Sequence, residues 1–334
     1  MSVDEFGLSS AKPCQAELIE LSLPLVQKKG VRLWVKRDDL RHPKISGNKW
    51  HKLKHNLIHA REQGYHGILS FGGPYSNHIH ALAYACHQNK LKSLAFIRGE
   101  AVVNPTLSDA LQWGMELEFV SRAEYRKKDT PEYLADLSVR FPDYFIVPEG
   151  GSNQLALAGC AELAQEVVAE LPGTDCLVVP CGTGGTLAGI SQGLDSFSAV
   201  DSGVLKKARS VLGMQVLKGE GYIARQVASL LQHSALTNWN VCEDYHFGGY
   251  AKVTADLAGF VQRFEVETGI PVEPVYSGKM FYGLMTLIAE DYFEPGSTIV
   301  AIHTGGLQGK RGMEDKLKRL EAKANHEELQ KLFV

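Results

Sequence analysis

The sequence predicts an α/β fold in which parallel strands are covered by helices. Short apolar runs alternate with segments of helical spacing along most of the chain. A glycine-rich turn, Cys181–Thr186, also joins one apolar run to a helical segment. Parallel strands need helical crossovers, and this alternation supplies them. The 334 residues are enough for about two domains.

The predicted elements follow in chain order. We expect strands at 31–35, 67–71, 94–97, 116–119, 144–147, 176–179, 210–214 and 298–302. Helical spacing predicts helices over 48–62, 79–89 and 184–194, and an amphipathic surface helix over 313–332 with a possible break at Asn325. A subunit contact is the alternative use of that last helix.

Composition narrows the class of protein. The content of 44% hydrophobic and 22% charged residues is typical of a soluble globular enzyme, and the net charge of −3 predicts no affinity for nucleic acid or membranes. Met1–Ser10 lacks a signal-peptide pattern, and no 18-residue apolar stretch occurs, so we expect a cytoplasmic protein. Six cysteines without metal-type spacing predict reduced core thiols and no metal site: Cys14, Cys86, Cys160, Cys176, Cys181 and Cys242. A thiolate favoured by a nearby helix N-terminus is the alternative for Cys181.

The glycine-rich turn is a candidate phosphate site. Gly182, Gly184 and Gly185 let the backbone approach an anion at a helix N-terminus, and Thr183 and Thr186 add hydroxyl donors. The spacing matches neither the dinucleotide fingerprint nor the nucleotide loop ending in Gly-Lys-Ser/Thr. A plain structural connection is therefore an equal alternative.

Two lysines stand one turn apart at the start of the helix predicted over 48–62. Lys49 and Lys52 share a helix face, and the proximity of a second ammonium and of the helix N-terminus should lower the pKa of Lys49. A lysine with a lowered pKa suits Schiff-base chemistry. Solvated surface charges are the alternative reading.

A second candidate anion site follows the strand at 67–71. Ser76 and Asn77 are good helix N-cap residues, and with the backbone at His78 they also offer donors to a carboxylate. Capping alone and carboxylate binding stay open at this point.

Taken together, these motifs resemble a known family. The chain carries Gly47-Asn48-Lys49, Gly72-Gly73 with Ser76-Asn77-His78, Gly150–Asn153, Gly182–Thr186, Pro274–Tyr276 with Gly278-Lys279, and His303–Gly306. Their order is similar to that of the aminocyclopropane-carboxylate deaminase and D-cysteine desulfhydrase family of pyridoxal-phosphate enzymes.

The resemblance implies two three-layer α/β domains of the tryptophan-synthase β-like type (fold type II). The larger domain would comprise residues 1–46 and 152–334, and the smaller one residues 47–151. We also expect the protein to be a homodimer.

The resemblance also implies roles for single residues. Lys49 is similar to the lysine that forms a Schiff base with pyridoxal phosphate, Lys52 to a phosphate contact and Thr304 to the residue beside the pyridine nitrogen. Asn77 resembles the partner of the cofactor's 3-hydroxyl group. The remaining implied contacts are the phosphate loop Gly182, Thr183, Gly184, Gly185 and Thr186, the substrate-carboxylate pocket Ser76, Asn77 and His78, and the substrate-facing Tyr276.

Two positions favour one branch of the family. Ser277 and Thr304 resemble the desulfhydrase type, whereas the ring-opening deaminases carry Glu and Leu there. The resemblance therefore implies β-elimination from D-cysteine, with 1-aminocyclopropane-1-carboxylate (ACC) deamination as the alternative. Trp50 and Tyr75 depart from the family pattern, and we expect them to narrow the pocket or stack near it.

Two other classes of protein are alternatives to a lyase. A dinucleotide-dependent oxidoreductase would use the Gly182 turn, but it leaves Lys49 unexplained and lacks the acidic residue about 20 positions further on. A non-catalytic cofactor-binding protein would keep the fold and lose turnover.

Overall fold

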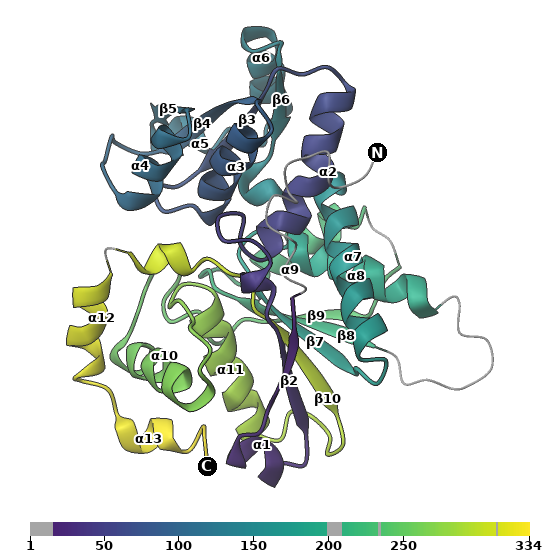
Figure 1. Cartoon of the computed structure of the whole chain (residues 1–334), viewed down its shortest axis with the longest axis vertical. Coiled ribbons are helices and arrows are strands. Elements are labelled where there is room, and N and C mark those ends of the chain that lie inside the picture. Colours follow the sequence, from purple (N-terminus) through teal and green to yellow (C-terminus); the bar gives the residue numbers. More distant parts are fainter. Residues whose placement is uncertain (1–15, 199–208, 233–234, 312) are drawn as a thin grey trace.

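The computed structural model describes residues 16–198, 209–232, 235–311 and 313–334, and within them the chain builds two β-sheets (Figure 1). Cys14 and Met1–Ser10 lie outside these residues. The larger sheet has the strand order β1-β2-β10-β7-β8-β9, and the smaller sheet has the order β5-β4-β3-β6. Every pairing is parallel except that of β1 with β2.

The larger sheet takes strands from both ends of the chain. They are β1 Leu18–Leu21, β2 Arg32–Lys36, β7 Cys176–Cys181, β8 Ser210–Gln215, β9 Trp239–Cys242 and β10 Thr298–Ile302. The sequence analysis did not predict β1 and β9, which are edge strands of four residues. The predicted strands match the other four to within two residues at either end.

Helices cover both faces of this sheet because alternate strand residues point in opposite directions. Leu177, Val179 and Ile302 pack against one layer, formed by α7 Gln154–Glu170, α8 Gly185–Ser198 and α9 Tyr222–Leu230. Leu33, Val178 and Ala301 pack against the other layer. That layer contains α1 Pro24–Lys28, α10 Ala255–Thr268 and α11 Ser277–Ala289.

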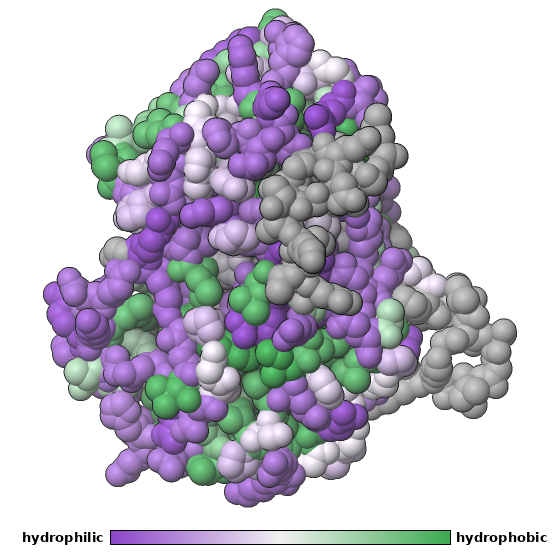
Figure 2. Space-filling model, in the orientation of Figure 1, coloured by the Kyte–Doolittle hydropathy of each residue, from purple (hydrophilic) through white to green (hydrophobic). Residues whose placement is uncertain are grey.

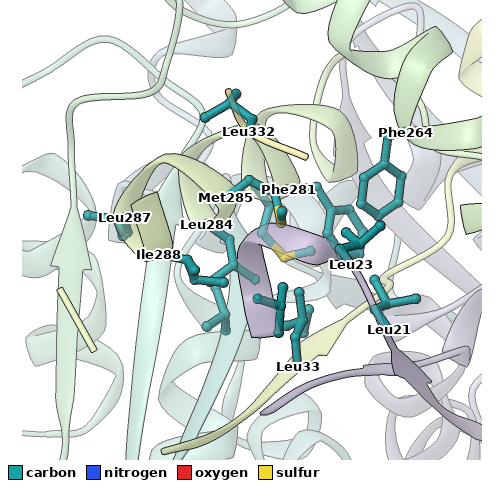
Figure 3. Packing of buried hydrophobic residues seen from close by; sticks show 14 of the residues in the cluster. Leu21, Leu23, Leu33, Phe264, Phe281, Leu284, Met285, Leu287, Ile288 and Leu332 are labelled. Carbon is teal, nitrogen blue, oxygen red and sulfur yellow. The ribbon is translucent and has the colours of Figure 1, made fainter. Parts of the chain in front are cut away.

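The larger of the two cores next to this sheet is shown in Figure 3. Side chains of α11, including Phe281, Leu284 and Ile288, belong to the same buried cluster as Leu33 of β2 and Leu21 of β1. The predicted C-terminal helix is broken by residues 322–325 into α12 Glu314–Glu321 and α13 His326–Gln330, where Asn325 caps the second helix. Leu329 and Leu332 join this core, so the end of the chain helps to cover α10.

The smaller sheet is built from the middle of the chain. Its strands are β3 Gly67–Gly72, β4 Lys92–Arg98, β5 Met115–Val120 and β6 Tyr144–Val147. It is covered by α2 Asn48–Glu62, α3 Asn77–Gln88 and α4 Pro105–Gln112 on one face, and by α5 Arg122–Tyr125 and α6 Pro131–Arg140 on the other. The domain boundaries at 46/47 and 151/152 stay a prediction, because α2 packs on α7 of the larger part as well as on α3.

Short 3₁₀ turns complete the connections. They are η2 Asp38–Leu40, η3 Glu149–Gly151 and η4 Leu307–Lys310. In η3, Gly150 and Gly151 both have φ of 67°, a conformation that glycine adopts without strain, and Asn153 caps α7. This connection carries the chain from the smaller to the larger sheet, as the sequence predicted.

Two features of the surface and the helices complete the fold. Hydrophilic residues dominate the face in Figure 2, and hydrophobic residues gather in its lower half, over the larger sheet. Among the described residues, no helix is both long and apolar enough to span a membrane.

Candidate functional site

A cavity of about 560 Å³ lies between the part of the molecule built on the larger sheet and the part built on the smaller sheet. The carboxyl ends of strands from both sheets point toward it. This is the place where open parallel sheets bind ligands. Of the residues predicted to act, all but Gly185 line it: Lys49, Lys52, Ser76, Asn77, His78, Gly182, Thr183, Gly184, Thr186, Tyr276 and Thr304. The fold thus brings together five segments that are far apart in the sequence.

Lys49 occupies the first turn of α2, which begins at the predicted residue. Its Nζ lies 2.9 Å from Oδ1 of Asn48, and burial, followed by the charge of Lys52, lowers the pKa of Lys49 to about 7. Gly47 supports this turn with φ of 62°, and a Cβ there would lie 2.0 Å from the carbonyl oxygen of Thr304. Only glycine therefore lets the start of α2 pack on the segment that carries Thr304.

The glycine-rich turn Cys181–Thr186, called the phosphate turn below, has room for an anion. Lys52 Nζ donates to the carbonyl of Gly150 at 2.9 Å and to Ser152 Oγ at 3.0 Å, and a Cβ on Gly185 would lie 3.0 Å from the same Nζ. Thr183 Oγ1 lies 2.6 Å from Ser152 Oγ. The turn precedes α8, whose first N–H groups lack partners within the helix.

The structure therefore fits a phosphate group at this turn. One ammonium, two hydroxyl groups and a helix N-terminus surround a space that any side chain on Gly185 would fill. Thr186 belongs to the same arrangement, because its Oγ1 accepts a hydrogen bond of 2.8 Å from Asn48 Nδ2. The phosphate turn and the start of α2 are thereby joined.

The loop after β3 holds the second candidate anion site. Ser76 caps α3, with its Oγ accepting from the N–H of Ile79 at 3.3 Å, so the capping role is real. Asn77 Oδ1 accepts from Gln308 Nε2 at 2.8 Å, which orients the Asn77 amide. His78 is buried, bonds Ser70 Oγ at 2.8 Å, and has its pKa held well below 6.5 by burial and by the two lysines.

Tyr276 closes the cavity from the larger sheet. Burial and the neighbouring hydroxyl of Tyr250 raise the pKa of Tyr276 well above 10, so the phenol carries its proton at neutral pH. The two rings lie 6.0 Å apart, and a Cβ on Gly182 would lie 3.1 Å from the Tyr276 ring. The phosphate turn therefore passes directly against this tyrosine.

Glu273, next to Tyr276, is a buried carboxylate that the sequence analysis did not single out. Glu273 accepts from the N–H groups of Val275, Tyr276 and Ser277, and burial raises its pKa. Ser277 is fully buried, and its Oγ lies 3.1 Å from the Glu273 carboxylate. Ser277 thus stands behind the cavity wall and does not line it.

Lys279 anchors the loop that carries Tyr250. Its buried Nζ donates to the carbonyls of Gly249 at 2.7 Å and His246 at 2.9 Å, and burial lowers its pKa to about 8. Phe247 and Ala251 in this loop have positive φ, so the loop needs such an anchor. Tyr250, Gln308 and Glu273 were missed because each lies outside the α-helices and strands, in a segment without hydrophobic periodicity.

Two expectations need correction. Trp50 and Tyr75 do not line the cavity: Trp50 is buried beside Arg41 and Lys54 on another side of α2, and Tyr75 is 53% exposed. Cys181 is a packed core residue, and burial raises its thiol pKa to about 12, so the thiolate alternative is wrong. Within the described residues, no cluster of three His, Cys, Asp or Glu side chains suits a metal ion.

Comparison with known proteins decides the family. The model of the family described as "Pyridoxal-phosphate dependent enzyme" matches residues 15–305. The chain belongs to this family. It resembles the "Bifunctional D-cysteine desulfhydrase/1-aminocyclopropane-1-carboxylate deaminase, mitochondrial" of Arabidopsis thaliana, with 32% identity over 87% of this chain and 76% of that protein.

Two further comparisons agree with this placement. A D-cysteine desulfhydrase of Serratia proteamaculans is 28% identical over 83% of this chain and 87% of that protein. The crystal structure of an ACC deaminase homologue superimposes with a TM-score of 0.77 at 28% identity, covering 96% of this chain and all of that one. The enzyme is therefore a pyridoxal-phosphate-dependent lyase or deaminase with the fold type II architecture that the sequence predicted.

Proposed function

We propose that the enzyme catalyses β-elimination from a small amino acid, with D-cysteine converted to pyruvate, ammonia and sulfide. The observation that carries this proposal is the position of Lys49. A lysine with a pKa near 7 shares one cavity with a phosphate cradle, a loop suited to a carboxylate, and a protonated tyrosine. When bound, pyridoxal phosphate draws electrons from the substrate's Cα, which makes the Cα proton removable.

Lys49 has two roles in this proposal. It would attach the cofactor, and its amine, when free, would accept the proton from the substrate's Cα. A pKa near the working pH suits a base that must be neutral before the step and charged after it. Asn48 orients the Lys49 amine through a hydrogen bond of 2.9 Å.

The other groups bind and orient. Lys52 and the segment Gly182–Thr186 would hold the cofactor's phosphate, Asn77 its 3-hydroxyl group and Thr304 its pyridine nitrogen. Ser76, Asn77 and the N–H of His78 hold the substrate carboxylate. Tyr276 remains protonated, so it donates a hydrogen bond or a proton to the leaving group and does not act as a base.

The contacts of Ser277 support elimination over ring opening. A glutamate at this buried position would bring a second carboxylate against Glu273, whose own pKa is already raised by burial. Thr304, with a neutral hydroxyl, does not hold a pyridine nitrogen protonated. ACC deamination to 2-oxobutanoate and ammonia is the second candidate, because the relatives in the comparisons carry both names.

The test compares two substrates on one preparation of holoenzyme. We expect pyruvate and sulfide to appear together from D-cysteine, faster than 2-oxobutanoate appears from ACC. The opposite order of rates would replace elimination with ring opening. A yellow protein that responds to no amino acid would be a non-catalytic cofactor-binding protein.

We also propose that the enzyme acts in the cytoplasm as a homodimer. The buried thiols of Cys86, Cys160 and Cys181 are in keeping with a reducing compartment. Light scattering after size-exclusion chromatography measures the assembly, and a monomer at micromolar concentration would contradict it.

A further inference from the structure

A short segment of the larger part reaches across to the smaller part beside the cavity. It comprises η4 and the residue after it, residues 307–311, and we call it the strap. It follows Thr304 and Gly305, which line the cavity, but none of residues 307–311 is among the described residues of that lining. Any effect of the strap on the cofactor must therefore pass through another side chain.

The strap is fixed to the larger part by a lysine. Lys310 Nζ pairs with the carboxylate of Glu265 on α10, and the same carboxylate accepts from the N–H of Val272 at 2.9 Å. Within the strap, Arg311 Nε donates to the carbonyl of Gln308 at 3.3 Å. The backbone that carries Gln308 is thus held by groups outside the cavity.

The strap is fixed to the smaller part through Asp109 of α4. Oδ2 of Asp109 accepts from Nη2 of Arg311 at 2.6 Å and lies 3.0 Å from Nε2 of His80. His80 is buried on α3 three residues after Asn77, so it lies about one turn along the same face of that helix. Asp109 therefore holds the strap against the helix that begins at Asn77.

Between these two anchors the strap meets the side chain of Asn77. Gln308 Nε2 donates to Asn77 Oδ1 at 2.8 Å, and both residues are half-buried. A Cβ on Gly306 would lie 2.4 Å from Asn77 Nδ2, and a Cβ on Gly309 would lie 3.6 Å from Asn77 Oδ1. The two ends of the amide therefore have different neighbours: Oδ1 faces the strap, and Nδ2 lies beside the residue that follows the cavity wall at Gly305.

The direction of this amide decides what Asn77 can bind. An asparagine amide has a donor end and an acceptor end, so a hydrogen bond that fixes one end also fixes the other. With Oδ1 bonded to Gln308, Nδ2 is the end left to meet the cofactor's 3-hydroxyl oxygen. An N–H donor stabilises that oxygen when it is ionised, whereas a turned amide would set two oxygen atoms against each other.

We propose that Gln308 is a positioning residue for the cofactor: it leaves the donor end of Asn77 free for the 3-hydroxyl oxygen, and the ion pair between Arg311 and Asp109 keeps Gln308 in place. This inference rests on the contact proposed between Asn77 and the cofactor, and not on the identity of the substrate. Because the bond from Gln308 to Asn77 joins the larger part to the smaller part, the ionisation of the 3-hydroxyl group depends on the seating of the strap.

The test measures absorbance spectra of holoenzyme variants without substrate. Gln308→Glu keeps the shape of the side chain but, when ionised, offers only acceptors, so the Asn77 amide turns to donate to it. We expect the ratio of the cofactor's visible band to its near-ultraviolet band to fall about tenfold, and the cofactor's dissociation constant to rise about tenfold.

Two milder variants and a control accompany it. Gln308→Met removes the bond without reversing the amide, and Arg311→Met removes the ion pair with Asp109, so both should lower the same ratio by a smaller factor. Gln112→Met is the matched control, because it makes the same exchange at an exposed residue of α4 that is not among the described lining residues. A wild-type ratio in Arg311→Met would contradict the role given to the ion pair.

Stability and a reference variant separate positioning from a structural role. If Gln308→Glu and Gln308→Met lower the free energy of unfolding of the apoenzyme and keep the wild-type spectrum, Gln308 is only structural. Asn77→Ala shows the spectrum without the contact itself, and an unchanged spectrum there would overturn the role of Asn77 and that of Gln308 with it. A changed spectrum in Asn77→Ala beside an unchanged one in Gln308→Glu would overturn the role of Gln308 alone. None of these results depends on whether the enzyme eliminates or opens a ring, because no substrate is present.

Discussion

The lowered pKa of Lys49 can be measured directly on the apoenzyme. An ordinary lysine with a pKa of about 10.4 is neutral in roughly one molecule in 2,500 at pH 7, whereas a pKa of about 7 makes about half of the amines neutral. At pH 7, Lys49 should therefore react about a thousandfold faster than a lysine of the same intrinsic nucleophilicity with an ordinary pKa. The causes are burial first and the charge of Lys52 second.

The assay is competitive labelling of the apoenzyme with pyridoxal, which lacks a phosphate, followed by borohydride and mass spectrometry across pH. We expect the labelling of Lys49 to have its midpoint near pH 7. Lys52→Met should raise this midpoint, while Lys54→Met, which removes a lysine bound to Glu162 on another side of α2, should not. A wild-type midpoint above pH 9.5 would refute the reasoning.

The same shift has a consequence for stability. The unfolded chain binds more protons at Lys49 than the folded chain does between about pH 7 and pH 10.5, so this residue makes the folded apoenzyme more stable as the pH rises through that window. Urea unfolding of the wild type and of Lys49→Met is measured across this pH range. The free energy of unfolding of the variant should rise less steeply with pH, because the contribution of Lys49 is lost. Equal slopes would mean that the folded-state pKa is ordinary.

Three substitutions test the surrounding groups. Gly184→Asp places an anion at a position with φ of 76° in the phosphate turn, so we expect a large loss of cofactor on dialysis, and full retention would contradict the cradle. Ser76→Ala should cost about 1 kcal/mol of stability as a lost cap but more than tenfold in kcat/KM, and losses of matching size would leave only the capping role. Lys279→Met leaves the carbonyls of His246 and Gly249 without their buried donor, so the free energy of unfolding should fall by about 2–4 kcal/mol in urea titrations, and an unchanged value would show that the loop does not need this anchor.

Much of the fold follows from local patterns in the sequence. The helix from Asn48 to Glu62 and the strand from Tyr144 to Val147 have the predicted ends, because each combines clear periodicity with a turn signal on both sides. The strands β1 and β9 escaped because they are short, carry Glu20 and Asn240 among apolar residues, and are stabilised by pairing with one neighbour only. Pairing of this kind is tertiary information.

The residues of the site likewise fall into those that local sequence patterns predict and those that depend on tertiary structure. Lys49 and the glycine-rich turn could be found because glycine positions and helix starts leave a local pattern. Trp50 was misplaced, although the geometry of a helix turns the residue after Lys49 by about 100° away from it. Arg98, Arg122 and Arg126 also line the cavity and could not be foreseen, because only the strand order brings the ends of β4 and β5 to it.

The covalent attachment of the cofactor tests the central claim most directly. Holoenzyme is reduced with borohydride and digested, and the pyridoxyl group is located by mass spectrometry. The arrangement of Lys49 beside the phosphate turn predicts that the label lies on Lys49. A label on Lys52 or Lys279 would contradict it.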